Sequence, residues 1–94
     1  MVIREMTTLK FTPHFKKAFN KLVKRNPDCA FDILNALLLF SNNPFNPVLK
    51  SHKLSGDKKE LWSFSVQSDL RIIFGFETHN TAILVNIGSH DEVY

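Results

Sequence analysis

The strongest constraint on the fold of this chain is a change in hydrophobic period at Glu60. Beyond it, Trp62, Phe64 and Val66 alternate with serine and glutamine, which predicts a strand with one face on a core and one facing water. Short polar turns at residues 68–69 and 77–80 lead into two more strands, over residues 70–76 and 81–87. Three successive strands on short turns predict an antiparallel meander.

Two helices are expected before the meander. Thr12-Pro13 is typical of a helix start, and apolar residues then recur at three- and four-residue spacing opposite a row of lysines. The segment 26–28 repeats the start signal, and the second, more apolar helix should end near Ser41. Because almost no linker separates the helices, they should form a helical hairpin. A short first strand is expected at residues 9–11, with residue 7 as its alternative start. Residues 50–59 should form a loop that contains a strand-like part near residues 53–54.

The expected order is therefore β-α-α-β-β-β, an α+β fold with an N-terminal helical hairpin packed on a small, mainly antiparallel sheet. Its 94 residues suit a single domain, 1–94, and nine Phe and one Trp supply large core side chains. Cys29 is expected to be a core or boundary residue. The beginning of the chain does not resemble a signal peptide, and the longest apolar run, residues 36–40, is too short to span a bilayer. We expect a cytoplasmic protein without a membrane partner.

Basic residues are concentrated in two places. Residues 1–26 hold seven basic side chains and one acidic one, whereas the rest of the chain holds five basic and eight acidic ones. The second cluster lies mid-chain and consists of Lys50, Lys53, Lys58 and Lys59. Basic clusters attract phosphate backbones, but they are also ordinary solvated surface, and charge alone leaves both interpretations open.

No cofactor site is predicted. The four histidines have no helical i, i+4 pairing with one another or with a carboxylate, and one cysteine cannot form a thiolate cluster. The three glycines lie too far apart for a phosphate-binding loop. We therefore expect neither a metal nor an organic cofactor.

Two residues are the main candidates for chemistry. Arg71 lies inside an otherwise apolar strand, so it either pairs with an acid such as Asp69 or Glu60, or its face of the sheet is open and its guanidinium could bind a phosphate. His90 follows Gly88, where we expect the sheet to end and the backbone to turn sharply. At the sheet's rim a histidine can exchange protons near neutral pH, but it is equally consistent with a polar residue on a loose tail. By position alone, His52 and Lys53 are surface loop residues.

Taken in order, the segments Leu54-Ser55-Gly56, 61–64, 69–74 and 87–94 resemble the RelE/ParE superfamily, the toxins of type II toxin–antitoxin modules. The similarity is greatest to RelE-like and YafQ-like mRNA interferases, and it covers essentially the whole chain. It implies an endoribonuclease that cleaves mRNA in the ribosomal A site and inhibits translation, and a cognate antitoxin that silences the toxin in a hetero-oligomer.

The resemblance also implies roles for particular residues. His52, Asp69 and His90 match the histidine, aspartate and second histidine of YafQ-like members, whereas another histidine of that branch is replaced near Ser65. Arg71 matches the arginine of RelE-like members. Lys50, Lys53 and Tyr94 are candidates for their basic and aromatic RNA contacts, with Lys58 and Lys59 nearby.

The resulting hypothesis is metal-independent cleavage through the 2′-hydroxyl of the RNA. His90 would protonate the leaving oxygen, Arg71 would hold the phosphate, and His52, assisted by Asp69, would act as the base; the acid and base roles are interchangeable at this stage. Two alternatives share the fold: a ParE-like DNA gyrase inhibitor, and a non-catalytic homologue that acts only through antitoxin binding.

Overall fold

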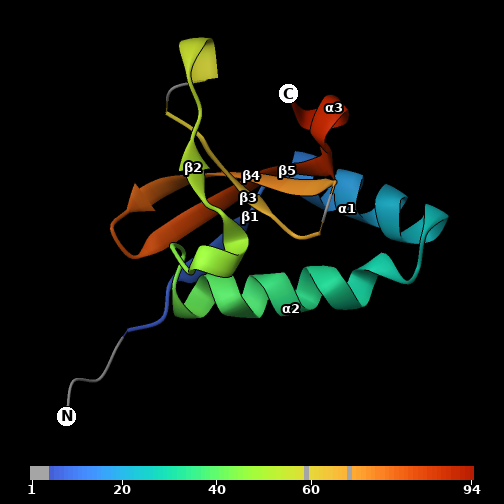
Figure 1. The fold of residues 1–94 in the computed structure, drawn as a ribbon, viewed down its shortest axis with the longest axis horizontal. Coiled ribbons are helices and arrows are strands. Elements are labelled where there is room, and N and C mark those ends of the chain that lie inside the picture. The colour runs from blue at the N-terminus through green and yellow to red at the C-terminus, as the bar shows by residue number, and fades with distance from the viewer. Residues whose placement is uncertain (1–4, 59, 68) are drawn as a thin grey trace.

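The computed structural model describes residues 5–58, 60–67 and 69–94. It contains one five-stranded sheet in the order β1-β5-β4-β3-β2 (Figure 1). The strands are β1 (Thr8–Phe11), β2 (His52–Lys53), β3 (Trp62–Ser65), β4 (Leu70–Thr78) and β5 (Thr81–Ser89). The helices are α1 (Pro13–Arg25), α2 (Cys29–Asn42) and α3 (His90–Val93), with two 3-10 turns, η1 (Pro47–Leu49) and η2 (Gly56–Lys58).

The sheet is mixed. Strands β2 to β5 pair antiparallel, and β1 pairs in parallel with β5, with Thr8 opposite Thr81 and Phe11 opposite Leu84. The α+β class, the helical hairpin and the meander are confirmed. The strand-like part of the loop lies at residues 52–53 rather than 53–54. The predicted turn at residues 68–69 includes Ser68, which lies outside the described residues.

The start of α1 follows from its sequence. Thr12 keeps an extended backbone, and its hydroxyl accepts a hydrogen bond from the Phe15 N–H at 3.0 Å. The same hydroxyl donates to the Val85 carbonyl at 3.1 Å, so one side chain caps α1 and ties it to β5. Pro13 occupies the first helical turn, where a missing N–H costs nothing.

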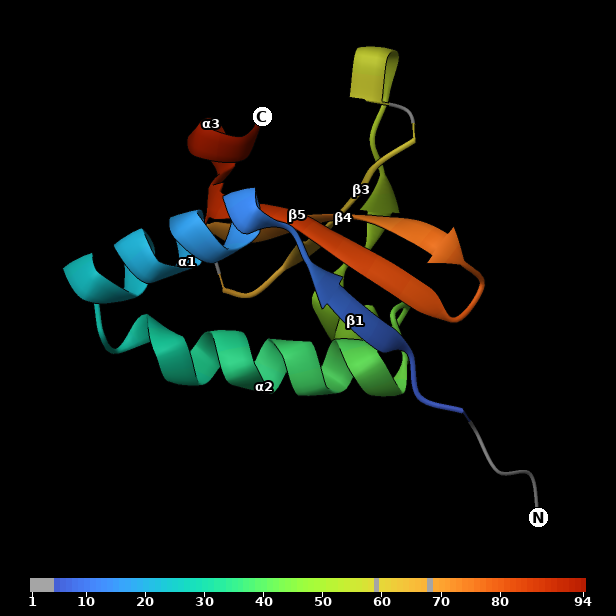
Figure 2. The same ribbon diagram turned by 180° about the vertical axis from the view of Figure 1, so that it is seen from behind.

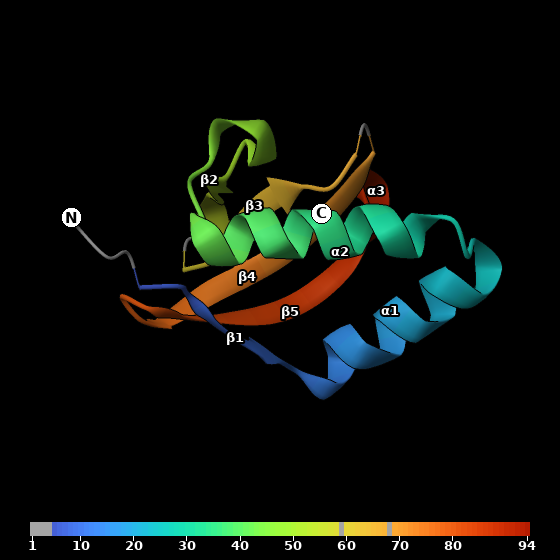
Figure 3. The ribbon, with the colours of Figure 1, turned by 90° about the horizontal axis from the view of Figure 1, so that it is seen from below.

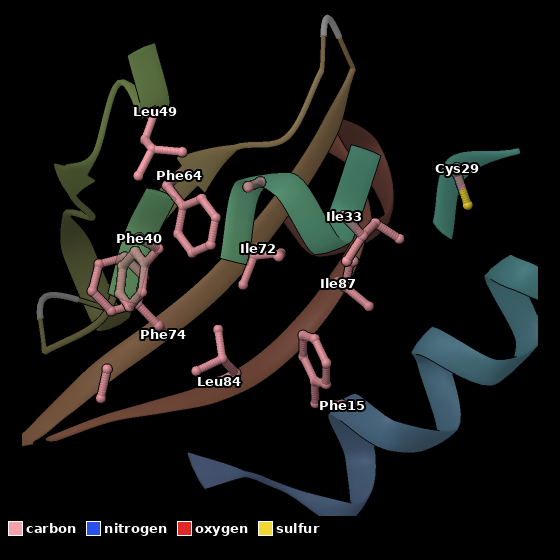
Figure 4. Packing of buried hydrophobic residues seen from close by; sticks show 12 residues of the cluster. Phe15, Cys29, Ile33, Phe40, Leu49, Phe64, Ile72, Phe74, Leu84 and Ile87 are labelled. Carbon is pink, nitrogen blue, oxygen red and sulfur yellow. The ribbon is translucent and has the colours of Figure 1, made fainter. Parts of the chain in front are cut away.

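Helix α2 covers one face of the sheet and α3 lies on the other, while α1 continues from β1 along the β5 edge (Figure 2 and Figure 3). The covered face forms the core, whose centre is Phe40 of α2, stacked on Phe64 at 4.6 Å and edge-on to Phe74 at 4.7 Å between ring centroids (Figure 4). All three rings are fully buried. Cys29 is also buried on α2, as expected. No helix in the described part of the chain is both long and apolar enough to cross a bilayer.

The end of β5 corrects one prediction. Gly88 does not turn the chain; it continues β5, directly opposite Arg71, and the backbone leaves the sheet only after Ser89. A Cβ atom on Gly88 would lie 3.2 Å from Glu92 Cβ and 3.3 Å from Val93 Cγ1. Glycine therefore stands here because α3 packs directly on the strand.

Candidate active site

The sheet face opposite α2 holds the polar residues of the meander. The register places His52, Ser63 and Ile73 in one cross-strand row, and Ser65, Arg71 and Gly88 in the next. These rows lie two residues apart along the strands, which is roughly 7 Å, and adjacent strands are about 4.8 Å apart. The Cα atoms of His52 and Arg71, two strands and two residues apart, are thus separated by roughly 12 Å, a gap that their long side chains can span to contact one phosphate.

Helix α3 places His90 over this face. Ser89 and Glu92 form a capping box: the Ser89 N–H donates to Glu92 Oε1 at 2.8 Å, and the Glu92 N–H donates to the Ser89 hydroxyl at 3.3 Å. These bonds with Ser89 lower the pKa of Glu92, and the charges of Arg25 and Lys21 act in the same direction. The His90 N–H also donates to the Asp69 carbonyl at 3.0 Å. His90 is therefore held in a defined helix rather than on a loose tail.

Tyr94 bridges the two ends of the site. Its ring packs edge-on to His90 with 4.5 Å between centroids, and its hydroxyl donates a hydrogen bond to the hydroxyl of Ser63. Ser63 is fully buried and sits directly opposite His52 in the sheet. A continuous chain of contacts therefore links the two candidate histidines through Tyr94 and Ser63.

The two histidines each have one ring nitrogen engaged. His52 Nδ1 lies 3.1 Å from the Lys50 carbonyl, an acceptor that pairs with the tautomer in which Nδ1 carries the proton; in that tautomer the lone pair of the neutral ring is on Nε2. His90 Nδ1 lies 3.6 Å from Asp91 Oδ1. Both rings are exposed, and the hydrogen bonds and ion pairs within residues 5–58, 60–67 and 69–94 engage Nε2 of neither ring.

The surroundings of Arg71 decide between an ion pair with a neighbouring acid and an open face of the sheet. Within residues 5–58, 60–67 and 69–94, no ion pair joins Arg71 to Asp69 or Glu60. Its Nη1 donates instead to the carbonyls of Gln67, at 3.0 Å, and Leu70, at 3.2 Å. The half-buried guanidinium thus rests on backbone oxygens at the polar face, with its charge not neutralised by those neighbours.

The remaining candidates are not all brought together. Asp69 lies at the other end of β3 from His52, where its exposed side chain borders a cavity shared with Ser89 and Glu92. Lys53 is opposite Trp62 and alternates with His52, so it leaves the sheet on the other side. Lys50 adopts a left-handed backbone with φ of 52° beside His52. The side chain of Lys58 and the whole of Lys59 lie outside the described part of the chain.

A hollow lies beside Tyr94. Leu54, Ser55, Asp57 and Tyr94 line a cavity of about 340 Å³ between the η2 loop and α3. In Figure 1 both segments rise from the same face of the sheet and leave a space between them over β3 and β4.

Among the described residues, no group of three His, Cys, Asp or Glu side chains could hold a metal ion.

A family model for the bacterial toxin YafQ of type II toxin–antitoxin systems matches residues 7–94. The chain belongs to the YafQ toxin family. This membership confirms the resemblance to RelE/ParE toxins and places the chain in its YafQ branch. No curated protein sequence matches significantly.

Several solved toxin structures are similar to this chain over nearly its whole length. A metal-bound toxin from Helicobacter pylori is 29% identical, with a TM-score of 0.72 over 95% of this chain and 100% of that one. YafQ in the Escherichia coli DinJ–YafQ toxin–antitoxin complex is 20% identical, with a TM-score of 0.76 over 95% and 98% of the two chains. A YoeB/ParE toxin from Agrobacterium tumefaciens is 15% identical, with a TM-score of 0.75 over 89% and 99%. The last two share the fold with this YafQ-family chain.

Three residues of the site escaped sequence reasoning. Ser63 was visible only as a polar position of an alternating strand, and nothing in the sequence pairs it with Tyr94. Ser89 and Glu92, in contrast, form a Ser-x-x-Glu pattern that is typical of a capping box and would have predicted α3.

Proposed function

We propose that this YafQ-family toxin is a ribosome-associated endoribonuclease that cleaves mRNA by acid–base catalysis and so inhibits translation. The observation that carries the proposal is the contact chain His90–Tyr94–Ser63–His52 beside Arg71 on one sheet face. Its target would place its action in the cytoplasm. Two histidines and an unneutralised cation on a common face are what transfer of a phosphoryl group from a 5′-oxygen to a 2′-oxygen requires.

The reaction needs three groups. His52 Nε2 would take the proton of the 2′-hydroxyl, and the resulting 2′-oxygen would attack the adjacent phosphorus. His90 would donate a proton to the 5′-oxygen as its bond to phosphorus breaks. The products are a 2′,3′-cyclic phosphate and a 5′-hydroxyl, and a positioned acid or base of this kind contributes about 10²–10⁴-fold to the rate.

Arg71 would meet the charge that develops on the phosphorane. A guanidinium presents several donors in a fixed fork, which suits the equatorial oxygens of a phosphate. Loss of one such charge stabiliser typically costs about 10²–10³-fold. The exposed face of the Tyr94 ring beside the 340 Å³ cavity would stack a base of the RNA, and Lys50, next to His52, would bind its backbone, whereas Lys53 points to the other side of the sheet and has no role in this proposal. In this proposal Asp69 holds the start of α3 in place, because its backbone carbonyl accepts the hydrogen bond from the His90 N–H. Assistance of its carboxylate to His52 remains a prediction.

Primer extension on a reporter mRNA in a cell-free translation reaction tests the function. Wild-type toxin should cut within translated codons, and His90→Ala should lower the yield of cuts by about 10²-fold or more. His79→Ala is the matched control, because His79 is an exposed histidine in the β4–β5 turn at the other end of the sheet. Equal effects of the two substitutions, or intact mRNA with wild-type toxin, would overturn the proposal; in the second case gyrase supercoiling becomes the assay of choice.

We also propose that the partner of this toxin is a cognate antitoxin that forms a hetero-oligomer with it. The support is family membership together with the DinJ–YafQ complex. Co-purification of the two proteins at a fixed ratio, with loss of mRNA cleavage in the complex, is the expected result.

A further inference from the structure

The cavity beside Tyr94 has an aromatic wall that is held in place from two sides. The Tyr94 ring packs edge-on to His90, with 4.5 Å between centroids, and its hydroxyl donates a hydrogen bond to the buried hydroxyl of Ser63. Tyr94 is nevertheless 41% exposed, and it borders the cavity of about 340 Å³. A ring that is already fixed loses little freedom when a planar ligand stacks on it.

The opposite wall of the cavity comes from the η2 loop. Leu54, Ser55 and Asp57 of this loop line the cavity together with Tyr94. Gly56 has a φ of 69°, a left-handed conformation that glycine adopts without strain, and a Cβ atom there would meet none of the described residues within 4 Å. Figure 1 and Figure 2 show from opposite sides that this loop and α3 stand apart above the same face of the sheet. The space between the two walls is therefore accessible to a ligand.

The polar groups of the loop wall are available to such a ligand. Within the described part of the chain, no hydrogen bond or ion pair engages the Ser55 hydroxyl or the Asp57 carboxylate. The RNA contacts proposed above, Arg71 and Lys50, are cationic, whereas Asp57 carries the same charge as a phosphate. A carboxylate beside a bound RNA strand repels it, unless the strand offers N–H donors that the carboxylate can accept. Asp57 should therefore favour some bases over others.

The chemistry of this wall distinguishes the four bases. A carboxylate accepts hydrogen bonds and donates none, so two adjacent N–H groups on a base match its two oxygens. Guanine presents N1–H and N2–H side by side on its Watson–Crick edge, and its neighbouring O6 accepts a hydrogen bond from a hydroxyl such as that of Ser55. Adenine and cytosine place an amino group beside an unprotonated ring nitrogen, whose lone pair repels a carboxylate oxygen. Uracil places its single N–H between two carbonyl oxygens, which repel the carboxylate in the same way.

We propose that the cavity between Tyr94 and the η2 loop is a guanine site, and that Asp57 makes the toxin select guanine at one fixed position next to the cut. The base stacks on Tyr94, Asp57 accepts its N1–H and N2–H, and the Ser55 hydroxyl donates to its O6. Proteins commonly read single-stranded RNA in this way, by stacking on an aromatic ring and by hydrogen bonds to the Watson–Crick edge. Because Tyr94 packs on His90, the nucleotide adjoins the scissile phosphate. This inference rests on the proposed ribonuclease function and names the specificity of that same site.

Primer extension in the cell-free translation reaction tests the proposal, with a reporter mRNA whose codons place each base on both sides of a cut. Wild-type toxin should prefer guanine at one flanking position by about 5–150-fold, which is what a bidentate contact to a base supplies. Asp57→Ala should lower this preference at least about 5-fold, because cleavage at guanine falls while cleavage at the other bases stays the same or rises. A variant with a disturbed fold would instead lose cleavage at all four bases alike.

Asp57→Asn gives a second outcome from the same reporter. A side-chain amide has one acceptor and one donor, which match the amino group and the ring nitrogen of adenine or cytosine. The preference should therefore shift from guanine towards these two bases. Asp28→Ala is the matched control, because it removes an exposed carboxylate at the start of α2 that does not line the cavity. This control should keep the base preference of the wild type.

A binding measurement separates the guanine site from the nuclease function. In NMR titrations of wild-type toxin, guanosine 5′-monophosphate should shift the signals of Ser55, Asp57 and Tyr94, with a Kd at least about 5-fold lower than those of the other three mononucleotides. Selective binding without mRNA cleavage would support the guanine site and overturn the nuclease. Equal Kd values for the four mononucleotides, or a guanine preference in cleavage that Asp57→Ala retains, would overturn the guanine site.

Discussion

Gly88→Ala tests whether α3 positions His90 and Tyr94, the groups of the proposed active site that it carries. The new Cβ atom would lie 3.2 Å from Glu92 Cβ and Oε1 and 3.3 Å from Val93 Cγ1, whereas optimal carbon contacts are about 3.5–4.0 Å. Helix α3 must therefore move by a few tenths of an ångström or more. Because it is a single turn attached to the sheet at Ser89, it moves more easily than β5 does.

The expected cost in stability is small and the expected cost in activity is large. Overpacking typically costs about 1–3 kcal/mol, and the preference of a strand for alanine over glycine offsets about 0.5–1 kcal/mol of it. Gly88→Ala should thus lower the free energy of unfolding by about 0–2.5 kcal/mol. A displacement of about 1 Å in a catalytic group can cost about 10²-fold in rate, so a shift of a few tenths of an ångström or more that carries both His90 and Tyr94 with α3 should cost several-fold or more.

Gly75→Ala provides the matched control. Gly75 is also a strand glycine, half-buried where Gly88 is buried, but its added Cβ would lie at ordinary contact distance from its neighbours, 3.5 Å from Leu61 Cδ2 and 3.8 Å from the Glu60 carbonyl oxygen. Urea unfolding followed by Trp62 fluorescence measures stability, and primer extension measures cleavage. If Gly88→Ala cleaves mRNA as fast as the wild type, or if both variants lose the same amount of cleavage activity, the packing of α3 on β5 does not determine the geometry of the site.

Three other perturbations have defined outcomes. Tyr94→Phe should lower the free energy of unfolding by about 1–3 kcal/mol because it leaves the buried Ser63 hydroxyl without its donor. In a double-mutant cycle measured by urea unfolding, adding Ser63→Ala should recover part of this loss. Additive effects of the two substitutions would contradict the hydrogen bond between these side chains. The lowered pKa of Glu92 stabilises the folded state above pH 4.5, and this contribution should disappear as the pH falls through the lower folded-state pKa. Hydrogen exchange in α3 should therefore become faster over that pH range in the wild type, and Glu92→Gln should abolish this pH dependence. Phe40→Ala should cost about 3–5 kcal/mol of unfolding free energy, against less than about 0.5 kcal/mol for the exposed Phe31→Ala, and similar midpoints for the two in urea would show that the aromatic cluster is not the centre of the core.

Local sequence patterns were sufficient for most of the fold. Alternation in β3 and helical periodicity in α1 and α2 are signals within one element, and each appears where it was expected. The end of β5 was different, because the reason for Gly88 is a contact with Val93, five residues further on in another element. A glycine signals only that a side chain is missing; whether the backbone turns or a neighbour approaches is decided by packing.

The candidate site divides in the same way. Residue types identified Arg71 and His90 as chemically capable, and the family resemblance added His52; that His52 and Lys53 point to opposite sides of the sheet follows only from the pairing of β2 with β3. The hydrogen bond between Tyr94 and Ser63 joins positions 31 residues apart and follows only from the register of β2, β3 and β4 together with the path of α3. The distance of Asp69 from His52 likewise depends on that three-dimensional arrangement. Long-range geometry of this kind leaves no periodic trace in a sequence.

The parallel pairing of β1 with β5 has a consequence for synthesis. Thr8 of β1 pairs with Thr81 of β5, so a ribosome adds 81 − 8 = 73 residues between the two partners. At about 5–20 residues per second, β1 waits several seconds for β5, the strand that joins it to the rest of the sheet. The sheet of the nascent chain therefore cannot grow strand by strand from β1. It is completed late, when pairing of β1 with β5 closes the long loop between them. A chain halted before residue 81 should leave β1 without its place in the sheet, however well α1 and α2 have formed.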